Sequence, residues 1–246
     1  MELNQYLVLA SFVALLIGMS KGGLPLVGMM SVPVLSLVMS PVKAAVLLLP
    51  LFVISDAVGI WLYRKNYSLV NLKILVPAGI AGVMFGWFTA ALISELTIKF
   101  LIGLVGVCFC LQTWFKRGSV QAPQPASLPK GIVWGGLAGF TSFIAHTGAP
   151  PVNAYLLPMR LDPVKFAATL SVYFFCMNFA KWVPYAALGL LDWRNLGTAL
   201  VLMPCVPLGV WSGVRIARRI DPKLFYQMVH LGMFLAGSKL LWDAWH

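Results

Sequence analysis

The sequence predicts an all-α polytopic membrane protein with two inverted repeats, each made of a broken, re-entrant helical hairpin and three transmembrane helices. Three observations predict this fold: 60% of the residues are hydrophobic against 10% charged, the apolar residues form eight long blocks, and short motifs recur in the second half. Blocks of about 20 apolar residues can cross a bilayer as helix. No polar segment is long enough for a separate soluble domain.

The recurring motifs delimit two halves. Pro41-Val42-Lys43 returns as Pro163-Val164-Lys165, Asn71-Leu72 as Asn195-Leu196, and Trp87 as Trp211, at nearly constant separation. The longest polar stretch lies between the halves, and its Gln, Ala and Pro content suits a flexible linker. We therefore predict one membrane domain with a first repeat at 1–118, a linker at 119–129 and a second repeat at 130–246.

The first element, a hairpin at 3–39, is interrupted by Ser20-Lys21-Gly22-Gly23-Leu24-Pro25. Backbone that glycine and proline prevent from continuing as helix is tolerated at membrane depth only where protein buries it or where it lines a cavity. A charge at that depth is costly as well. We therefore interpret the break at Lys21 as a binding site, against the alternative of a short turn between two interfacial helices.

Spans at 43–63, 72–94 and 97–115 complete the first repeat. Asp56 lies deep in the first of these spans. It is the candidate for proton coupling, a salt-bridge partner of Lys21 or Lys181, or a polar group that packs helices together. Among these alternatives we favour a buried pairing over proton carriage.

The second repeat begins with a hairpin at 131–158, broken at His146-Thr147-Gly148-Ala149-Pro150-Pro151, and continues with spans at 164–191, 195–215 and 222–244. Corresponding breaks in paired halves are the best sequence indication of a transporter binding site. In the first of these spans Asn178 aligns with Asp56, and Lys181 lies three residues later on nearly the same helix face. Lys181 either attracts an anion or extends toward the membrane interface.

The distribution of basic residues favours a re-entrant second hairpin. If every segment crossed, the lysines and arginines outside the spans would divide almost evenly between the two sides. If 131–158 turns back, only Lys43, Lys99 and Arg194 lie opposite all the others. Because basic loops are cytoplasmic, this predicts a non-cytoplasmic C-terminus and, with a hairpin as the first element, a non-cytoplasmic N-terminus. The first hairpin follows from the repeat alone, and three crossings per repeat then invert one repeat relative to the other.

Both breaks offer the chemistry of an anion site. Helix ends at a glycine-rich break present unpaired N–H groups and the positive end of a dipole, and Lys21 adds a charge. The predicted substrate-binding residues are Ser20, Lys21, Gly22, Gly23, Pro25, His146, Thr147, Gly148, Pro150, Asn153, Asn178 and Lys181. The four cysteines and three histidines show no metal-ligand spacing, so we expect no metal and no cofactor.

The chain resembles the sulfite exporter TauE/SafE family, also called the toluene-sulfonate uptake permease group. The resemblance covers nearly the whole chain and rests on the Ser-Lys-Gly-Gly-Leu-Pro break at 20–25, the second break at 146–151, the repeated Pro-Val-Lys and the size. The second break departs from the Gly-Gly-Pro type expected of the family, because it reads His146-Thr147-Gly148-Ala149-Pro150. The resemblance implies a membrane carrier of sulfite, sulfoacetate or related organosulfonates.

We therefore predict a secondary transporter of a small sulfur-containing anion that works by alternating access around a midplane site between two hairpin tips. Paired carboxylates and a Ser/His/Asp arrangement are missing from the sequence, which argues against an enzyme. The alternatives are an intramembrane enzyme, a non-transporting assembly or sensory subunit, and a passive anion channel. The expected partners are the anion, protons as the candidate coupling ion and a bacterial inner membrane, with homo-oligomerisation left open. The excess of 18 basic over 7 acidic residues is interpreted as loops that face anionic lipid, not as a nucleic-acid surface.

Overall fold

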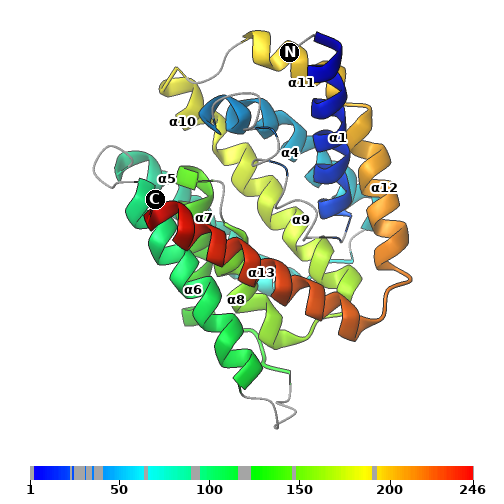
Figure 1. Ribbon diagram of the computed structural model, residues 1–246. Coiled ribbons are helices and arrows are strands. Elements are labelled where there is room, and N and C mark those ends of the chain that lie inside the picture. Colours follow the sequence, from blue (N-terminus) through cyan, green and yellow to red (C-terminus); the bar gives the residue numbers. More distant parts are fainter. Residues whose placement is uncertain are drawn as a thin grey trace. The chain divides into compact units, whose positions relative to one another are not determined.

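The computed structural model describes residues 3–22, 24, 31, 35, 41–63, 66–89, 95–115, 123–145, 148–189 and 193–245, and within these ranges all regular secondary structure is helical (Figure 1). The elements are α1 (Leu3–Lys21), α4 (Pro41–Tyr63), α5 (Leu69–Thr89), α6 (Glu95–Phe115), α7 (Leu128–Ala145), α8 (Ala149–Leu156), the 3-10 turn η1 (Leu157–Met159), α9 (Pro163–Ala180), α10 (Trp182–Ala187), α11 (Trp193–Leu202), α12 (Cys205–Ala217) and α13 (Pro222–Trp245).

By length and composition, some of these helices could cross a membrane. Among the described residues, Leu69–Thr89 and the combined stretch Pro163–Ala187 are both long and apolar enough to cross a bilayer. Shorter apolar helices occupy Leu7–Lys21, Leu47–Tyr63 and Cys205–Ile216. The all-helical character expected from the sequence is therefore present, while the inverted arrangement of the two halves remains a prediction.

Two of the stretches expected as single spans are interrupted by proline. α9 and α10 are separated by a turn at Lys181, and α11 and α12 by a turn at Met203 and Pro204. Proline lacks the N–H that would bond to the carbonyl four residues earlier. Pro184 therefore leaves the Ala180 carbonyl without a helical partner, and after Pro204 the Leu200 carbonyl instead accepts a hydrogen bond from Met203 N at 3.3 Å.

The chain forms two compact units, and each unit contains helices from both sequence halves. The first unit is Met1–Tyr67 with Pro163–Met228, and the second is Ser68–Asp162 with Val229–His246. The first unit therefore includes α1, α4 and α9 to α12, whereas the second includes α5 to α8. α13 contributes its residues through Met228 to the first unit and the remainder to the second.

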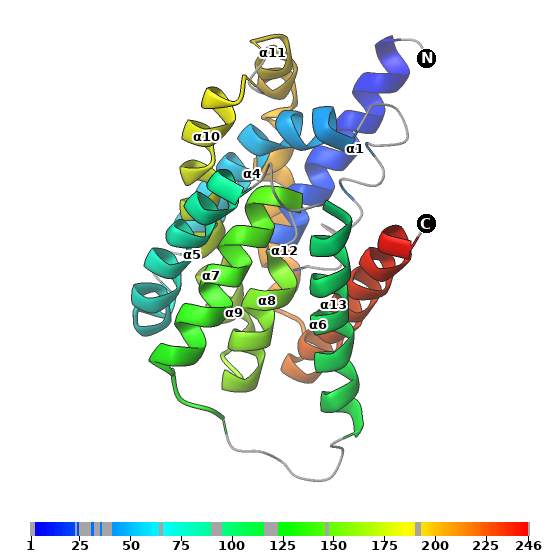
Figure 2. The same ribbon diagram turned by 90° about the vertical axis from the view of Figure 1, so that its left-hand side faces the viewer.

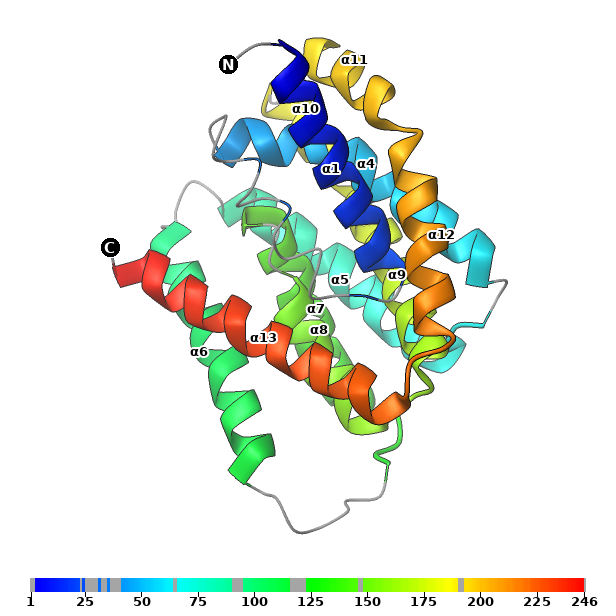
Figure 3. The same cartoon turned by 45° about the vertical axis from the view of Figure 1, so that its right-hand side comes forward.

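In the first unit, α1 packs along α12 and α4 packs along α9, as Figure 3 shows for α1 and α12. Glycines line the contact between α1 and α12. A Cβ added at Gly22 would lie 2.6 Å from the Gly213 Cα, and one added at Gly209 would lie 3.0 Å from the Gly18 Cα. Small residues four apart on each helix let the two backbones approach closely, as is common between membrane helices. Around this contact lies the apolar core of the unit, which includes Val13, Ile17, Leu48, Leu51, Val206 and Val210.

In the second unit, α7 packs along α5 (Figure 2), and α8 contacts both α7 and α6. Glycines again line the helix crossing, because a Cβ added at Gly82 or Gly139 would overlap the backbone of the facing helix at Gly136 or Gly79. Each unit thus contains the same kind of glycine-lined contact between two helices. The first helix of each predicted repeat, α1 or α7, packs on a later helix of the other repeat, α12 or α5.

The two predicted hairpins are described to different extents. Around the second break, α7 and α8 pack against each other, so the two arms of the segment 131–158 lie side by side. Tyr155 connects α8 to α5 and to the residue before α7. Its hydroxyl donates to Asn71 Oδ1 at 3.2 Å and accepts from Ser127 N at 3.3 Å. For the first hairpin, α1 and the residues Leu24, Ser31 and Leu35 are described, whereas most of the predicted returning arm lies outside the described residues.

Candidate functional site

Lys21 is the last residue of α1, where the helix ends at the predicted break. The helical bonding ends with Gly22 N donating to Gly18 O at 2.9 Å, and Leu24 N then reaches back to Met19 O at 3.1 Å. The Gly22 carbonyl, which the interrupted helix leaves unpaired, accepts a hydrogen bond of 2.6 Å from the Tyr63 hydroxyl at the end of α4. This buried bond holds the end of α1 against α4.

Asp56 is the ionic partner of Lys21. The carboxylate comes from the middle of α4, is fully buried, and its Oδ1 lies 3.0 Å from Lys21 Nζ. An ion pair within 4 Å satisfies that oxygen. Of the two salt bridges considered from the sequence, the one between Lys21 and Asp56 is therefore present. The expected buried pairing of Asp56 is thus observed.

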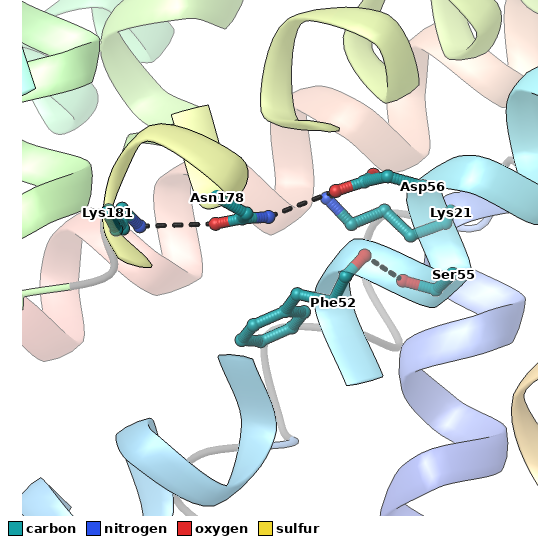
Figure 4. Close-up of polar contacts among 6 residues, drawn as sticks. All are labelled: Lys21, Phe52, Ser55, Asp56, Asn178 and Lys181. Carbon is teal, nitrogen blue, oxygen red and sulfur yellow. Dashed lines mark hydrogen bonds and ion pairs between the residues drawn. The ribbon is translucent and has the colours of Figure 1, made fainter. Parts of the chain in front are cut away.

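The second oxygen of Asp56 is bound to Asn178 on α9. Asn178 Nδ2 donates to Asp56 Oδ2 at 3.0 Å, and its own Oδ1 accepts a hydrogen bond from Lys181 Nζ at 3.2 Å. Figure 4 shows the four side chains joined end to end, from Lys21 through Asp56 and Asn178 to Lys181. We call these four residues the lysine–aspartate chain.

Aromatic rings cover the Lys21 ammonium. Lys21 Nζ lies 4.4 Å from the centroid of the Phe174 ring and 5.8 Å from that of Phe52. The face of a phenyl ring attracts a cation through its quadrupole, most strongly where water is scarce. These rings therefore stabilise a positive charge that has one carboxylate partner and sits among apolar helices.

Lys181 is more deeply buried than Lys21. Its exposed fraction is 1%, against 16% for the side chain of Lys21. It occupies the turn between α9 and α10, held by Lys181 N to Met177 O at 3.1 Å and by Tyr185 N to Lys181 O at 3.0 Å. The turn directs Lys181 inward instead of toward an interface, so the snorkelling alternative is wrong for this residue.

The lysine–aspartate chain contains two basic groups and one acid. With all three ionised, its net charge is positive, and the positive excess lies at the Lys181 end because Lys21 neutralises Asp56. Buried charges are stable only when paired and hydrogen-bonded. The arrangement therefore favours a negatively charged guest. In the described part of the chain no group of three His, Cys, Asp or Glu residues is placed to hold a metal ion.

The other predicted site residues fall into two groups. Ser20 and Gly22 flank Lys21 in the first unit, whereas Gly148 directly precedes α8 in the second unit and Pro150 and Asn153 lie within that helix. Asn153 is 2% exposed, and its Oδ1 has no hydrogen-bond partner among the described residues. Gly23, Pro25, His146 and Thr147 lie outside the described residues. The substrate-binding role of all these residues remains a prediction.

Some residues near Lys21 were not identified from the sequence. Tyr63, the last residue of α4, was not among the predicted site residues, but its hydroxyl donates a hydrogen bond to the Gly22 carbonyl. Ser171 on α9 is 1% exposed, and its Oγ has no hydrogen-bond partner in the described ranges. A Cβ added at Gly59 of α4 would lie 3.0 Å from that Oγ and 3.7 Å from the Lys21 carbonyl oxygen. No local motif indicates either contact, because the partners are distant in sequence.

A family model described as sulfite exporter TauE/SafE matches residues 7–240, nearly the whole chain. The matched region includes α4, α9 and all four residues of the lysine–aspartate chain. Searches of curated proteins and of solved structures returned no match.

Proposed function

Because this chain belongs to the sulfite exporter TauE/SafE family, a family of membrane transporters of small anions, we propose that it is a secondary transporter of a sulfur-containing anion such as sulfite, sulfoacetate or a related organosulfonate. The observation that carries the proposal is the lysine–aspartate chain, in which Lys21 pairs directly with the buried Asp56 carboxylate and Lys181 is linked to it through Asn178. Charged side chains inside membrane proteins face the protein interior and mark substrate or ion pathways.

Lys21 supplies the attraction for the anion in this proposal. Its ammonium is held by Asp56 and by the Phe174 ring, so it is oriented before any anion arrives. Additional candidate donors are the hydroxyl of Ser20, the preceding residue on α1, and the hydroxyl of Ser171, which lies beside Gly59 of α4. A tetrahedral or pyramidal oxyanion has several acceptor oxygens and needs such donors from more than one direction.

Alternating access between the predicted repeats 1–118 and 130–246 is part of the same proposal. It is supported by the position of Asp56 and Asn178, which align in the two halves 122 residues apart and hydrogen-bond to each other. Residues related by an internal two-fold axis meet only near that axis. The exchanged packing of α1 on α12 and of α7 on α5 further supports two related halves. Inverted repeats place the binding site near the bilayer midplane at the repeat interface.

A thermal-stabilisation screen of the detergent-purified protein tests the substrate class. The panel contains sulfite, sulfoacetate, methanesulfonate, taurine, sulfate and acetate. A ligand that binds only the folded protein stabilises it by about 2.7 kcal/mol at a concentration of 100 Kd. We expect at least one sulfite-like or sulfonate anion to raise the unfolding temperature more than acetate or sulfate does. Equal shifts with all six compounds would indicate a non-specific effect and contradict the proposal.

Cysteine accessibility tests the proposed topology, with cytoplasmic basic loops and non-cytoplasmic termini. Ser40→Cys and Arg160→Cys are placed singly in a background in which Cys108, Cys110, Cys176 and Cys205 are alanine. If 131–158 is re-entrant, the two sites lie on opposite sides of the membrane, and a membrane-impermeant maleimide in intact cells labels Ser40→Cys alone. If that segment crosses, both sites lie on one side and label together, which would reject the hairpin.

A further inference from the structure

Lys181 is a buried amine without a carboxylate of its own. Its Nζ donates to Asn178 Oδ1 at 3.2 Å, and within the described ranges it has no ion-pair partner. A neutral amide oxygen accepts a hydrogen bond from an uncharged amine as well as from an ammonium group. Burial without a counter-charge disfavours the ammonium form, because the ion gives up its hydration and gains no opposite charge.

Asn178 cannot supply the missing charge, because its side-chain amide is neutral. Its Nδ2 donates to Asp56 Oδ2, which directs its Oδ1 toward Lys181. The other oxygen of Asp56 is already paired with Lys21. The single carboxylate of the lysine–aspartate chain is therefore matched by one ammonium group, that of Lys21. A second positive charge at Lys181 would have no opposite charge to balance it.

The groups on neighbouring elements do not alter this balance. Asp56 on α4 and Lys21 on α1 are the charged groups described above. On the same helical stretch as Lys181 are Tyr173, Cys176 and Tyr185, which are uncharged near neutral pH. α12, which also contacts α9, carries Arg215, whose guanidinium lies 5.3 Å from the centroid of the Trp211 ring.

We propose, on the basis of the anion transport proposed above, that Lys181 carries the coupling proton. In the empty site Lys181 is a neutral amine, and it takes up one proton when a monovalent anion binds beside it. The step joins a free proton to the Nζ lone pair, breaks no covalent bond, and adds one positive and one negative charge together. Anion and proton then move as an electroneutral pair, while Asp56 stays ionised and paired with Lys21.

This assignment places the coupling proton on a different residue from the one suggested by the sequence. Asp56 was the coupling candidate because it is the acidic residue deepest in a span. In the structure both of its oxygens are engaged, one by an ammonium group and one by an amide N–H. A residue that must gain and lose a proton in every cycle is better placed where a charge has no permanent partner.

Isothermal titration calorimetry tests the proposal with methanesulfonate, a monovalent anion whose own charge is constant over the working range. The purified full-length protein is titrated at about pH 8 in phosphate and in Tris, buffers with very different ionisation enthalpies. The dependence of the binding enthalpy on the buffer gives the number of protons taken up. We expect about one proton per anion, and affinity that falls up to about tenfold per pH unit as the solution becomes more alkaline.

Two substitutions locate the proton. Lys181→Arg carries a fixed charge, so it should bind methanesulfonate with no proton uptake and with affinity independent of pH. Lys181→Met removes the basic group and should also show no uptake, with weaker binding. The matched control is Lys239→Arg on α13, where an exposed lysine is paired with Asp243 at 2.8 Å, and this variant should keep one proton per anion.

The outcomes separate the two proposals. Binding to the wild-type protein with no proton uptake would overturn the role of Lys181 and leave anion transport intact. Proton uptake that persists in both Lys181→Arg and Lys181→Met would assign the proton to another group. Failure of methanesulfonate and of every other anion in the screen to bind would reject the proposed function, and the inference about Lys181 with it.

Discussion

Lys21→Met should be the most damaging single substitution at the site, with loss of both stability and anion transport. It leaves the fully buried Asp56 carboxylate without its ionic partner, which lies 3.0 Å away in the wild type. Removing one member of a buried ion pair costs about 3–5 kcal/mol because the remaining charge is uncompensated. We expect a marked fall in the unfolding temperature of the detergent-purified protein and no anion flux in proteoliposomes.

A double substitution separates these two effects. In Lys21→Met/Asp56→Asn the unpaired carboxylate is gone, and the new side-chain amide can still hydrogen-bond to Asn178 in place of Asp56. This variant should regain most of the lost stability, with a coupling energy of roughly 0.5–3 kcal/mol in the double-mutant cycle. Transport should stay absent, because the Lys21 ammonium group, which contacts the anion in the proposed site, is not restored. Wild-type stability of Lys21→Met alone would show that the ion pair does not contribute to the fold.

Gly213→Leu should have the second largest effect, through the contact between α1 and α12. A Cβ at Gly213 would come within 2.8 Å of the Gly22 Cα and 3.1 Å of the Gly22 carbonyl carbon, so the leucine side chain has no space unless the helices separate. Overpacking of this kind costs about 1–3 kcal/mol and sometimes more. Because Gly22 directly follows Lys21, separation would also displace the end of α1 from Asp56. We expect a lower unfolding temperature and reduced flux.

The matched control for this substitution is Gly197→Ala on α11. No atom lies within 4 Å of a Cβ added there, so the methyl group has space. Alanine in place of glycine within a helix contributes up to about 1 kcal/mol of stability, because the unfolded chain loses freedom. Gly197→Ala should therefore be neutral or slightly stabilising. If Gly213→Leu behaved like Gly197→Ala, the close approach of α1 and α12 would be refuted.

The helices could be predicted from the sequence to within a few residues where an apolar stretch has no internal proline break. The span expected at 43–63 is α4 (Pro41–Tyr63), and the one expected at 97–115 is α6 (Glu95–Phe115). The breaks at Lys181 and at Met203 were not predicted, because proline at these positions either kinks or ends a membrane helix, depending on which neighbouring groups replace the missing hydrogen bond. Whether such a proline kinks a helix or ends it therefore depends on tertiary contacts.

The chemical character of the site could also be predicted, but its connections could not. Lys21, Asp56 and Lys181 could be identified from the sequence because they lie inside apolar stretches, where a charge is costly. Their pairing depends on which helices cross, and a span that contains Asp56 offers both lysines as partners with equal plausibility. The contact of Tyr63 with the Gly22 carbonyl joins residues 41 positions apart and has no sequence signature. A salt bridge of Asp56 with Lys21 was among the alternatives considered from the sequence, whereas the alignment of Asp56 with Asn178 did not predict that the two side chains are in direct contact.

Uptake of radiolabelled sulfite into proteoliposomes tests most directly whether the Lys21–Asp56 ion pair serves anion transport. The comparison is between the wild-type protein and Lys21→Met/Asp56→Asn, at equal amounts of protein that is shown to be folded by its unfolding temperature. We expect uptake by the wild-type protein and, for the double variant, uptake no greater than in protein-free vesicles. Equal uptake by the two folded proteins would contradict the account, because Lys21 and Asp56 would then be structural residues with no part in transport.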